Sequence, residues 1–255
     1  MKKILSVARV TFRESIRNKT ILAILLLGLA FAASALLLAE LALDQRVRVI
    51  TDWGLFCLSA FGVGLAIILG VNLVHKEVVR KTLYVVLARP MERWKYVVGK
   101  FLGVLAVLSV EVVVLSLALV AMLALEGKGL KLLLFKAMVL SAAEIVLVAA
   151  IALFFSSFSS PYLSGFFALG VFLVGRSLPV LEKLIEKIEI PAVHWPLKGM
   201  FFVLPDLADL NLASRVVNDI PIEWASVANG VLYAVGYAGL LVLFSCLVFG
   251  RRELS

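Results

Sequence analysis

Residues 132–156 read LLLFKAMVLSAAEIVLVAAIALFFS, a continuous apolar stretch with only two charged residues. A helix of about 20 apolar residues is long enough to cross the hydrocarbon core of a bilayer. Similar stretches recur along the chain, and six membrane spans are predicted at 20–43, 53–74, 96–125, 132–156, 162–181 and 227–250. None of them alternates apolar with polar residues, which argues against a membrane β-barrel.

The composition of the whole chain agrees with this interpretation. Of the 255 residues, 63% are hydrophobic and 16% are charged, and the mean hydropathy is +1.08. Soluble domains have about half apolar and about a quarter charged residues. We therefore predict an all-α, polytopic membrane protein. It comprises an amphipathic helix over 1–19 and a six-span transmembrane domain over 20–255.

The first 19 residues, MKKILSVARVTFRESIRNK, predict a helix with one apolar and one basic face. At about 100° per residue, the apolar face contains Met1, Ile4, Leu5, Ala8, Phe12 and Ile16. The basic face contains Lys2, Lys3, Arg9, Arg13 and Arg17, which could anchor the helix to an anionic leaflet. The alternative is a solvated helix that does not touch the membrane.

The distribution of Lys and Arg predicts the orientation, because basic residues favour the cytoplasmic side. With the N-terminus inside, the cytoplasmic pieces 1–19, 75–95, 157–161 and 251–255 hold fourteen basic residues, and the outer pieces 44–52, 126–131 and 182–226 hold eight. Both termini are therefore expected in the cytoplasm, on the inner side of the plasma (inner) membrane. Anchoring to the lipids of the inner leaflet explains the net charge of +8, so no nucleic-acid partner is expected.

Three charged residues within the spans are candidate functional residues, because charge inside a membrane is costly. Glu111 lies near the middle of the third span, Glu144 at similar depth in the fourth, and Arg176 in the outer part of the fifth. One interpretation is that they line a translocation path. The other, slightly favoured, is that they make polar contacts between helices, with Ser109, Ser116 or Ser141 as the expected hydrogen-bond partners of the acids.

No motif for catalysis or cofactor binding is found. Cys57 and Cys246 are expected near opposite sides of the membrane, too far apart for a disulfide, and His75 and His194 are likewise separated. The chain has no G-x-x-x-x-G-K-[ST] phosphate loop, no serine–histidine–acid arrangement and no His-Glu-x-x-His motif. By itself the chain is therefore not predicted to be an enzyme, and no metal or cofactor is expected on it.

The outer segment 182–226 is long and is interrupted by Pro191, Pro196, Pro205 and Pro221. Its residues 199–217, GMFFVLPDLADLNLASRVV, are too apolar for a free loop. Short helices packed onto the outer leaflet are expected here. A substrate lid and a docking surface for an outer-face accessory protein are the alternatives.

The segment between the second and third spans resembles a known family. Residues 75–103 read HKEVVRKTLYVVLARPMERWKYVVGKFLG. This stretch resembles the first cytoplasmic loop of type-2 ABC transporter permeases, which shows an acid, a Thr-Leu pair, a short apolar stretch, a basic-Pro step and an Arg before an aromatic residue and Gly-Lys. Lys81 stands where many members have glycine. The resemblance extends to the basic start of the chain, the six-span layout, FFSSFSSP after the fourth span and VLPDLADLNL before the sixth.

The resemblance implies a permease dimer that works with a separate ABC ATPase, to which ATP and Mg would bind. It also implies that loop 75–95 contains a coupling helix that enters a cleft of the ATPase, with Leu83, Tyr84, Val86 and Leu87 as its apolar ridge. The residues implied in this contact are Glu77, Arg80, Lys81, Thr82, Leu83, Tyr84, Val86, Leu87, Arg89, Pro90 and Arg93. A basic, aromatic-flanked membrane border would look similar and is the alternative.

The sequence thus predicts the permease subunit of an ABC exporter, with a homodimer as the simpler assembly. An ion-coupled secondary transporter that uses Glu111 and Glu144 is a second hypothesis. A membrane scaffold that couples ATP hydrolysis to an outer-face partner without transport is a third. The substrate cannot be chosen among lipid, peptide, drug and ion.

Overall fold

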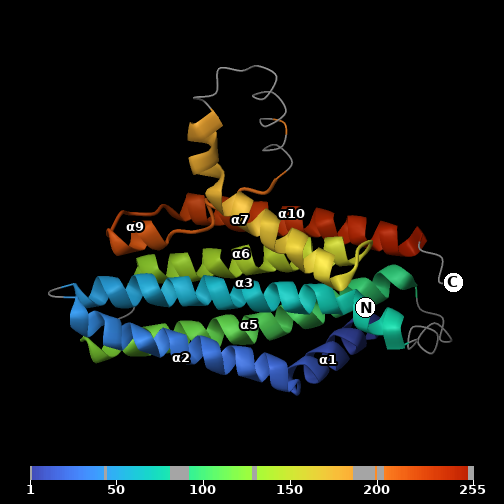
Figure 1. Cartoon of the computed structure of the whole chain (residues 1–255), viewed down its shortest axis with the longest axis horizontal. Helices are drawn as coiled ribbons and strands as arrows, with labels where there is room; N and C mark the ends of the chain where they lie inside the picture. Colours follow the sequence, from blue (N-terminus) through green and yellow to red (C-terminus); the bar gives the residue numbers. More distant parts are fainter. Residues whose placement is uncertain are drawn as a thin grey trace.

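The computed structural model describes residues 2–42, 45–80, 92–127, 131–185, 199 and 204–251. These residues form helices and contain no strand (Figure 1). The elements are α1 (Lys2–Ile16), α2 (Lys19–Leu41), α3 (Arg46–Arg80), α5 (Arg93–Leu125), α6 (Leu132–Ser156), α7 (Pro161–Ile185), α9 (Ala213–Val217) and α10 (Trp224–Arg251). Among them α2, α3, α5, α6, α7 and α10 are long and apolar enough to cross a membrane. The predicted all-α, six-span fold is confirmed.

Several helices extend beyond the spans expected from hydropathy. α3 begins at Arg46 rather than 53, so most of the expected outer piece 44–52 is helical. At its other end α3 continues to Arg80, and α5 begins at Arg93, which shortens the expected connection 75–95 from both sides. Hydropathy marks where the hydrocarbon core ends. A helix forms its backbone hydrogen bonds internally, so it can continue beyond that point into water. The 35 residues of α3 reach about 52 Å, well beyond a hydrocarbon core of about 30 Å.

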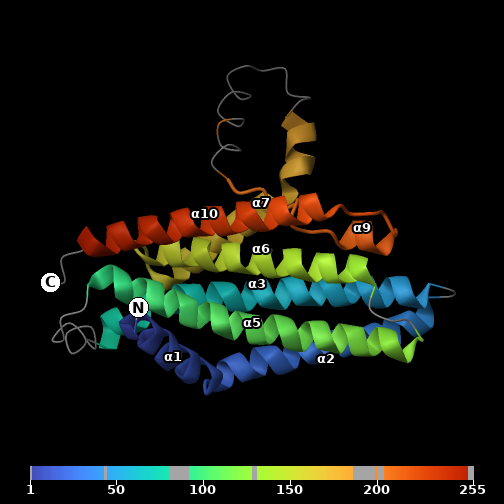
Figure 2. The ribbon, with the colours of Figure 1, turned by 180° about the vertical axis from the view of Figure 1, so that it is seen from behind.

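The core of the bundle is built around α6 and α3. Both are largely buried, whereas α2, α5, α7 and α10 lie around them and expose apolar side chains (Figures 1 and 2). Small residues allow α3 and α6 to approach closely: a Cβ at Gly70 would lie 2.7 Å from the Ala152 Cβ and 2.9 Å from the Ala149 carbonyl oxygen. Close backbone packing of this kind stabilises helix pairs in membranes. Lipid tails are as apolar as leucine side chains, so the hydrophobic effect does not drive helices together there.

Two interhelical contacts establish the relative register of α3 and α6. Ser59 Oγ donates to Glu144 Oε2 at 2.9 Å, and Ser156 Oγ donates to the Val71 carbonyl oxygen at 2.8 Å. The residues of each pair are 85 positions apart in the sequence. α3 and α6 therefore run in the same direction, as the second and fourth spans of a six-span chain must.

The amphipathic helix α1 packs against α5 at one end of the bundle (Figure 2). Gly99 and Gly103 make this contact possible, because a Cβ there would lie 2.9 Å from the Ile4 carbonyl oxygen and 2.7 Å from the Ala8 carbonyl oxygen. The single apolar face predicted for α1 is therefore divided: its Ile4 and Ala8 side faces α5, and Leu5 is 71% exposed. The basic face, with Lys3, Arg9, Arg13 and Arg17, is exposed as expected.

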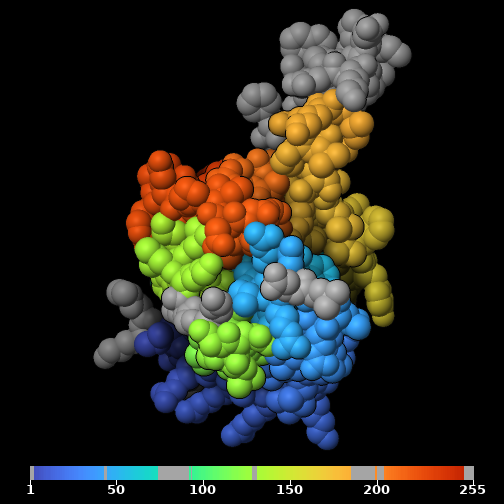
Figure 3. Space-filling model, turned by 90° about the vertical axis from the view of Figure 1, so that its left-hand side faces the viewer, coloured from blue at the N-terminus to red at the C-terminus, as the bar shows by residue number. Residues whose placement is uncertain are grey.

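The segment after α7 returns into the bundle. α7 contains Pro179, and its final turns stand out from the side of the bundle (Figures 1 and 3). Residues 204–212 are non-helical and precede the short helix α9. The Leu207 N–H donates to the Gly175 carbonyl oxygen at 3.2 Å, which attaches this segment to α7. Part of the segment expected on the outer surface is therefore packed between spans.

Candidate functional site

A buried ion pair connects three of the spans. Glu144 of α6 is completely buried and accepts hydrogen bonds from Ser59 Oγ of α3 and from Arg176 Nη1 of α7, at 2.9 and 3.0 Å. Arg176 Nη1 also donates to Ser59 Oγ at 2.7 Å. The guanidinium lies 5.7 Å from the centre of the Phe172 ring. Glu144 is thirteenth of the 25 residues of α6, so this cluster lies at the middle of the bundle.

The chemistry of the Ser59–Glu144–Arg176 cluster explains how a carboxylate persists in the core. A charge removed from water is stable only when an opposite charge and hydrogen bonds compensate it, and here one guanidinium and one hydroxyl contact the two carboxylate oxygens. The Arg176 side chain is 27% exposed, so the pair is not sealed completely from the surface of the bundle. The cluster holds α3, α6 and α7 in one arrangement at mid-depth.

The sequence indicated Glu144 and Arg176 as candidates but did not identify their partner. The expected partners Ser109, Ser116 and Ser141 are not the ones that Glu144 uses: Ser109 donates to its own helix, at the Leu105 carbonyl oxygen. Ser59 was missed. The available signal was a hydroxyl in the middle of the second apolar span, at the depth of the two acids.

Glu111 lies at a depth similar to that of the cluster but is not part of it. Lys100 Nζ donates to the Leu73 carbonyl oxygen at 3.2 Å, and Leu119 lies against Gly54, so α5 is antiparallel to α3 and Glu111 is level with Gly62. That is three residues, about 4.5 Å along the helix axis, from the level of Ser59. Glu111 is 2% exposed, and neither carboxylate oxygen has a hydrogen-bond partner among the described residues.

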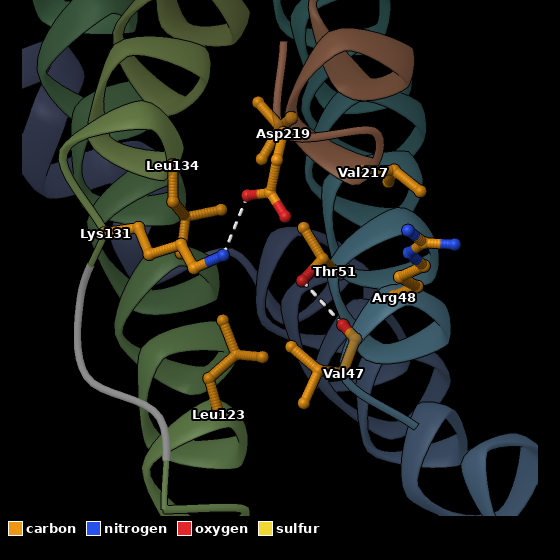
Figure 4. A pocket seen from close by; sticks show the side chains of 9 residues that line it. Val47, Arg48, Thr51, Leu123, Lys131, Leu134, Val217 and Asp219 are labelled. Atoms are coloured by element: carbon orange, nitrogen blue, oxygen red, sulfur yellow. Dashed lines mark hydrogen bonds and ion pairs between the residues drawn. The ribbon is translucent and has the colours of Figure 1, made fainter. Parts of the chain in front are cut away.

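Two lysines attach the segment before α10 to the far end of α6. Lys136, 7% exposed, donates to the Ile222 carbonyl oxygen and lies 4.7 Å from the centre of the Trp224 ring. Lys131 Nζ forms an ion pair with Asp219 at 2.7 Å (Figure 4). The hydrogen bond from Lys131, together with its charge, holds the pKa of Asp219 below its ordinary value.

The cavity beside this ion pair is small. Figure 4 shows side chains of α3, α5 and α6 around it, with Thr51 donating to the carbonyl oxygen of Val47 in its own helix. Its volume is about 50 Å³. That is room for very few waters and not for an organic substrate. We therefore infer that Lys131, Lys136 and Asp219 stabilise the fold.

Comparison with known proteins identifies the family. A family model described as an ABC-2 family transporter protein matches residues 5–254. The chain belongs to the ABC-2 transporter family. No curated protein matches it. As an ABC-2 family member it is a multi-pass membrane permease of an ABC transporter, a transport component rather than a catalytic subunit, and the family in general implies an ABC ATPase as partner.

The expected coupling segment of the ABC-2 permease is described only at its two ends, which belong to α3 and α5. Glu77 and Arg80 lie on the last turns of α3, and Arg93 begins α5. Glu92, just before α5, accepts hydrogen bonds from Lys95 and Trp94, which hold the pKa of its carboxyl below the ordinary value. The other coupling residues, namely Lys81, Thr82, Leu83, Tyr84, Val86, Leu87, Arg89 and Pro90, lie outside the described residues.

The described part of this ABC-2 permease contains no group of three or more His, Cys, Asp or Glu side chains that could hold a metal ion. Cys57 is buried, Cys246 is half-buried, and both are free thiols. The side chains that the structure does bring together, Ser59, Glu144 and Arg176, form an interhelical polar contact at the middle of the bundle.

Proposed function

We propose that this chain is the permease subunit of an ABC exporter, which moves substrate across the plasma (inner) membrane with ATP hydrolysed by a separate nucleotide-binding subunit. The observation that carries the proposal is the family match over residues 5–254 on a fold with six membrane-spanning helices. ATP and Mg are assigned to the partner, since the chain itself has no phosphate-binding loop.

The coupling of ATP hydrolysis to transport is assigned to residues 75–95. α3 and α5 are long continuous helices, so a force applied between Arg80 and Arg93 acts directly on two spans. α3 carries Ser59 about 30 Å further along its axis, and Ser59 contacts both members of the Glu144–Arg176 pair. Movement of α3 by the ATPase would therefore change the hydrogen bonds that hold α7 against the core.

The polar groups on the α7 side of the bundle favour a homodimer. The exposed large apolar residues of α7 are Tyr162, Leu163, Phe166, Phe167, Leu169, Leu173, Val180 and Leu184. Lipid could cover these residues, but α7 also exposes Glu182 and Lys183 where its final turns leave the bundle at mid-length (Figure 1). Exposed charges of this kind require protein or water around them rather than lipid. A second copy, with an aqueous pathway between the two α7 helices, satisfies both the charges and the apolar face.

The proposed orientation puts α1, the end of α3 and both termini in the cytoplasm. It rests on the excess of Lys and Arg in the pieces 1–19 and 75–95. The exposed basic face of α1 would then face the anionic inner leaflet, as in the sequence-based expectation.

The test is co-purification with the ATPase followed by transport. The permease is co-expressed with candidate ABC ATPases, and the isolated complex is assayed for ATPase stimulation across a panel of lipids, peptides, drugs and ions. Inside-out vesicles should then accumulate the stimulating substrate only with ATP. Accumulation driven by a proton or sodium gradient without ATP would instead support the ion-coupled transporter, a second candidate that the unpartnered Glu111 favours.

A further inference from the structure

Residues 204–212 bring non-helical backbone to the depth of the buried ion pair. Pro205 and Leu207 lie against Gly175, where an added Cβ would be 2.6 Å from the Pro205 carbonyl oxygen. Gly175 precedes Arg176, whose guanidinium contacts Glu144 at the middle of α6. In hydrocarbon, irregular backbone is tolerated only where protein buries it or where it lines a water-filled cavity.

One side of the 204–212 segment is buried by protein, and the other side lines a cavity. Leu207 and Leu210 are completely buried and Leu212 nearly so, which attaches one side of the segment to the core. Asp206 and Asp209 are on the other side, and both line a cavity of about 460 Å³ between this segment and α10. Cavities of about 300–1,000 Å³ are typical of small-molecule sites.

The polar groups of this cavity have unused hydrogen-bonding capacity. Tyr233 Oη accepts the Asp206 N–H at 2.9 Å and can still donate its own hydrogen. Asp206 Oδ1 accepts the N–H of Ala208 at 2.9 Å, which leaves Oδ2 available. The side chains of Asp209, Arg215 and Asn229 also line the cavity, and none of the three has a hydrogen-bond or ion-pair partner among the described residues.

The balance of charge indicates which ligand fits. Two carboxylates face one guanidinium, so the cavity favours a cation, and the remaining acceptors suit a group with several N–H donors. Leu140, Leu210 and Leu212 provide an apolar wall of the cavity. A ligand with an ammonium group and an apolar body matches both surfaces.

We propose that this cavity binds the ammonium group of an amphipathic organic cation, with Asp206 and Asp209 as its charged ligands and the leucine wall against its apolar part. This inference goes beyond the exporter assignment, because binding does not require ATP, and the ligand can be a transported substrate or a bound regulator.

The proposal is tested by fluorescence titration of the purified permease in lipid nanodiscs with dansylcadaverine, a primary amine on an apolar fluorophore. Dansylamide, which lacks the amine, is the matched ligand control. Wild type should bind dansylcadaverine saturably, and Asp206→Asn/Asp209→Asn should weaken the Kd about tenfold or more. Asp52→Asn, which changes an exposed aspartate outside the cavity, should leave the Kd unchanged.

Asp209→Asn serves as the second variant, because the Asp209 carboxylate makes no hydrogen bond to any residue that the structure describes, whereas Asp206 supports the backbone of Ala208. It should weaken binding without changing the thermal unfolding temperature. Absence of saturable dansylcadaverine binding to wild type, or equal binding of dansylamide, would overturn the proposal. So would a Kd within about twofold of wild type for the double variant. None of these results depends on the ATPase, so they are distinguishable from a failure of the exporter assignment.

Discussion

At the scale of single residues, Arg176 and Glu144 compensate each other's burial, so removing one member should cost more than removing both. Arg176→Met leaves the fully buried Glu144 without a counter-charge and should lower the free energy of unfolding by about 3 kcal/mol. Arg176→Met/Glu144→Leu removes both charges and should recover part of this loss. Thermal unfolding of the detergent-purified permease measures the effect.

The control for this comparison is Arg48→Met, which removes an exposed arginine near the beginning of α3, away from the ion pair. It should change the unfolding temperature little, since exposed charges contribute little to stability. If the double variant is as unstable as Arg176→Met alone, the ion pair is not what holds α7 against α3 and α6.

Glu111 should behave differently, because its carboxylate has no hydrogen-bond partner in the described part of the chain. Glu111→Gln should leave assembly intact and lower ATP-driven transport by no more than a few-fold, and Glu111→Leu should be at least as stable as wild type, since it removes a buried polar group without a hydrogen bond. Complete loss of transport in Glu111→Gln with normal ATPase activity would point to an ion relay through this carboxyl.

These residues also show how far sequence reasoning extends. Hydropathy and charge placed Glu111 and Glu144 at similar depth, which the register of α3 with α5 and α6 bears out. They did not indicate which acid meets Arg176, because rotation of the helices about their axes decides it. Close contacts such as that of Gly62 with Ile145 and that of Gly70 with Ala152 contribute to this rotation, and one sequence alone does not reveal them.

At the scale of elements, the contact of α1 with α5 depends on Gly99 and Gly103. Gly103→Ala puts a Cβ 2.7 Å from the Ala8 carbonyl oxygen, so α1 must shift away. Trypsin should then cleave after the exposed Arg9 and Arg13 faster than in wild type, as followed by mass spectrometry of inside-out vesicles. Gly64→Ala is the matched control, since nothing lies within 4 Å of an added Cβ there. Equal cleavage of Gly103→Ala and wild type would contradict this packing.

The elements also show where hydropathy alone misplaces a boundary. The apolar runs located all six spans, but α3 extends beyond its run at both ends, with charged residues Arg46 and Arg80 at its limits. The 204–212 segment was expected on the outer leaflet, because its sequence is apolar and broken by Pro205. Its apolar residues instead pack between α7 and α10, a tertiary preference that composition does not distinguish from interfacial packing.

At the scale of the whole molecule, topology is the first property to test. Single cysteines are introduced near Arg13, Arg93, Glu186 and Asp209 in a variant without Cys57 and Cys246. A membrane-impermeant thiol reagent applied to intact cells should label the positions near Glu186 and Asp209 and spare the other two, because basic pieces stay inside. Labelling near Arg93 from outside would overturn the exporter assignment, since the coupling segment must face ATP.

The connection between permease and ATPase is the remaining step from this fold to transport. α3 ends at Arg80 and α5 begins at Arg93, and two permeases would offer two such connections to a pair of nucleotide-binding subunits. Leu83→Asp/Leu87→Asp should bury two unpaired charges in each ATPase cleft, at a cost of several kcal/mol. The ATPase should then no longer be recovered with the permease from detergent.

Leu83→Ala/Leu87→Ala, which removes volume without adding charge, should weaken this association less. Insertion and thermal unfolding of the permease should be unchanged in both variants, because these side chains act on the partner. Full ATP-driven transport in the double Asp variant would exclude the Leu83–Leu87 ridge as the coupling contact and leave the length and charge of this loop to be explained by the membrane border.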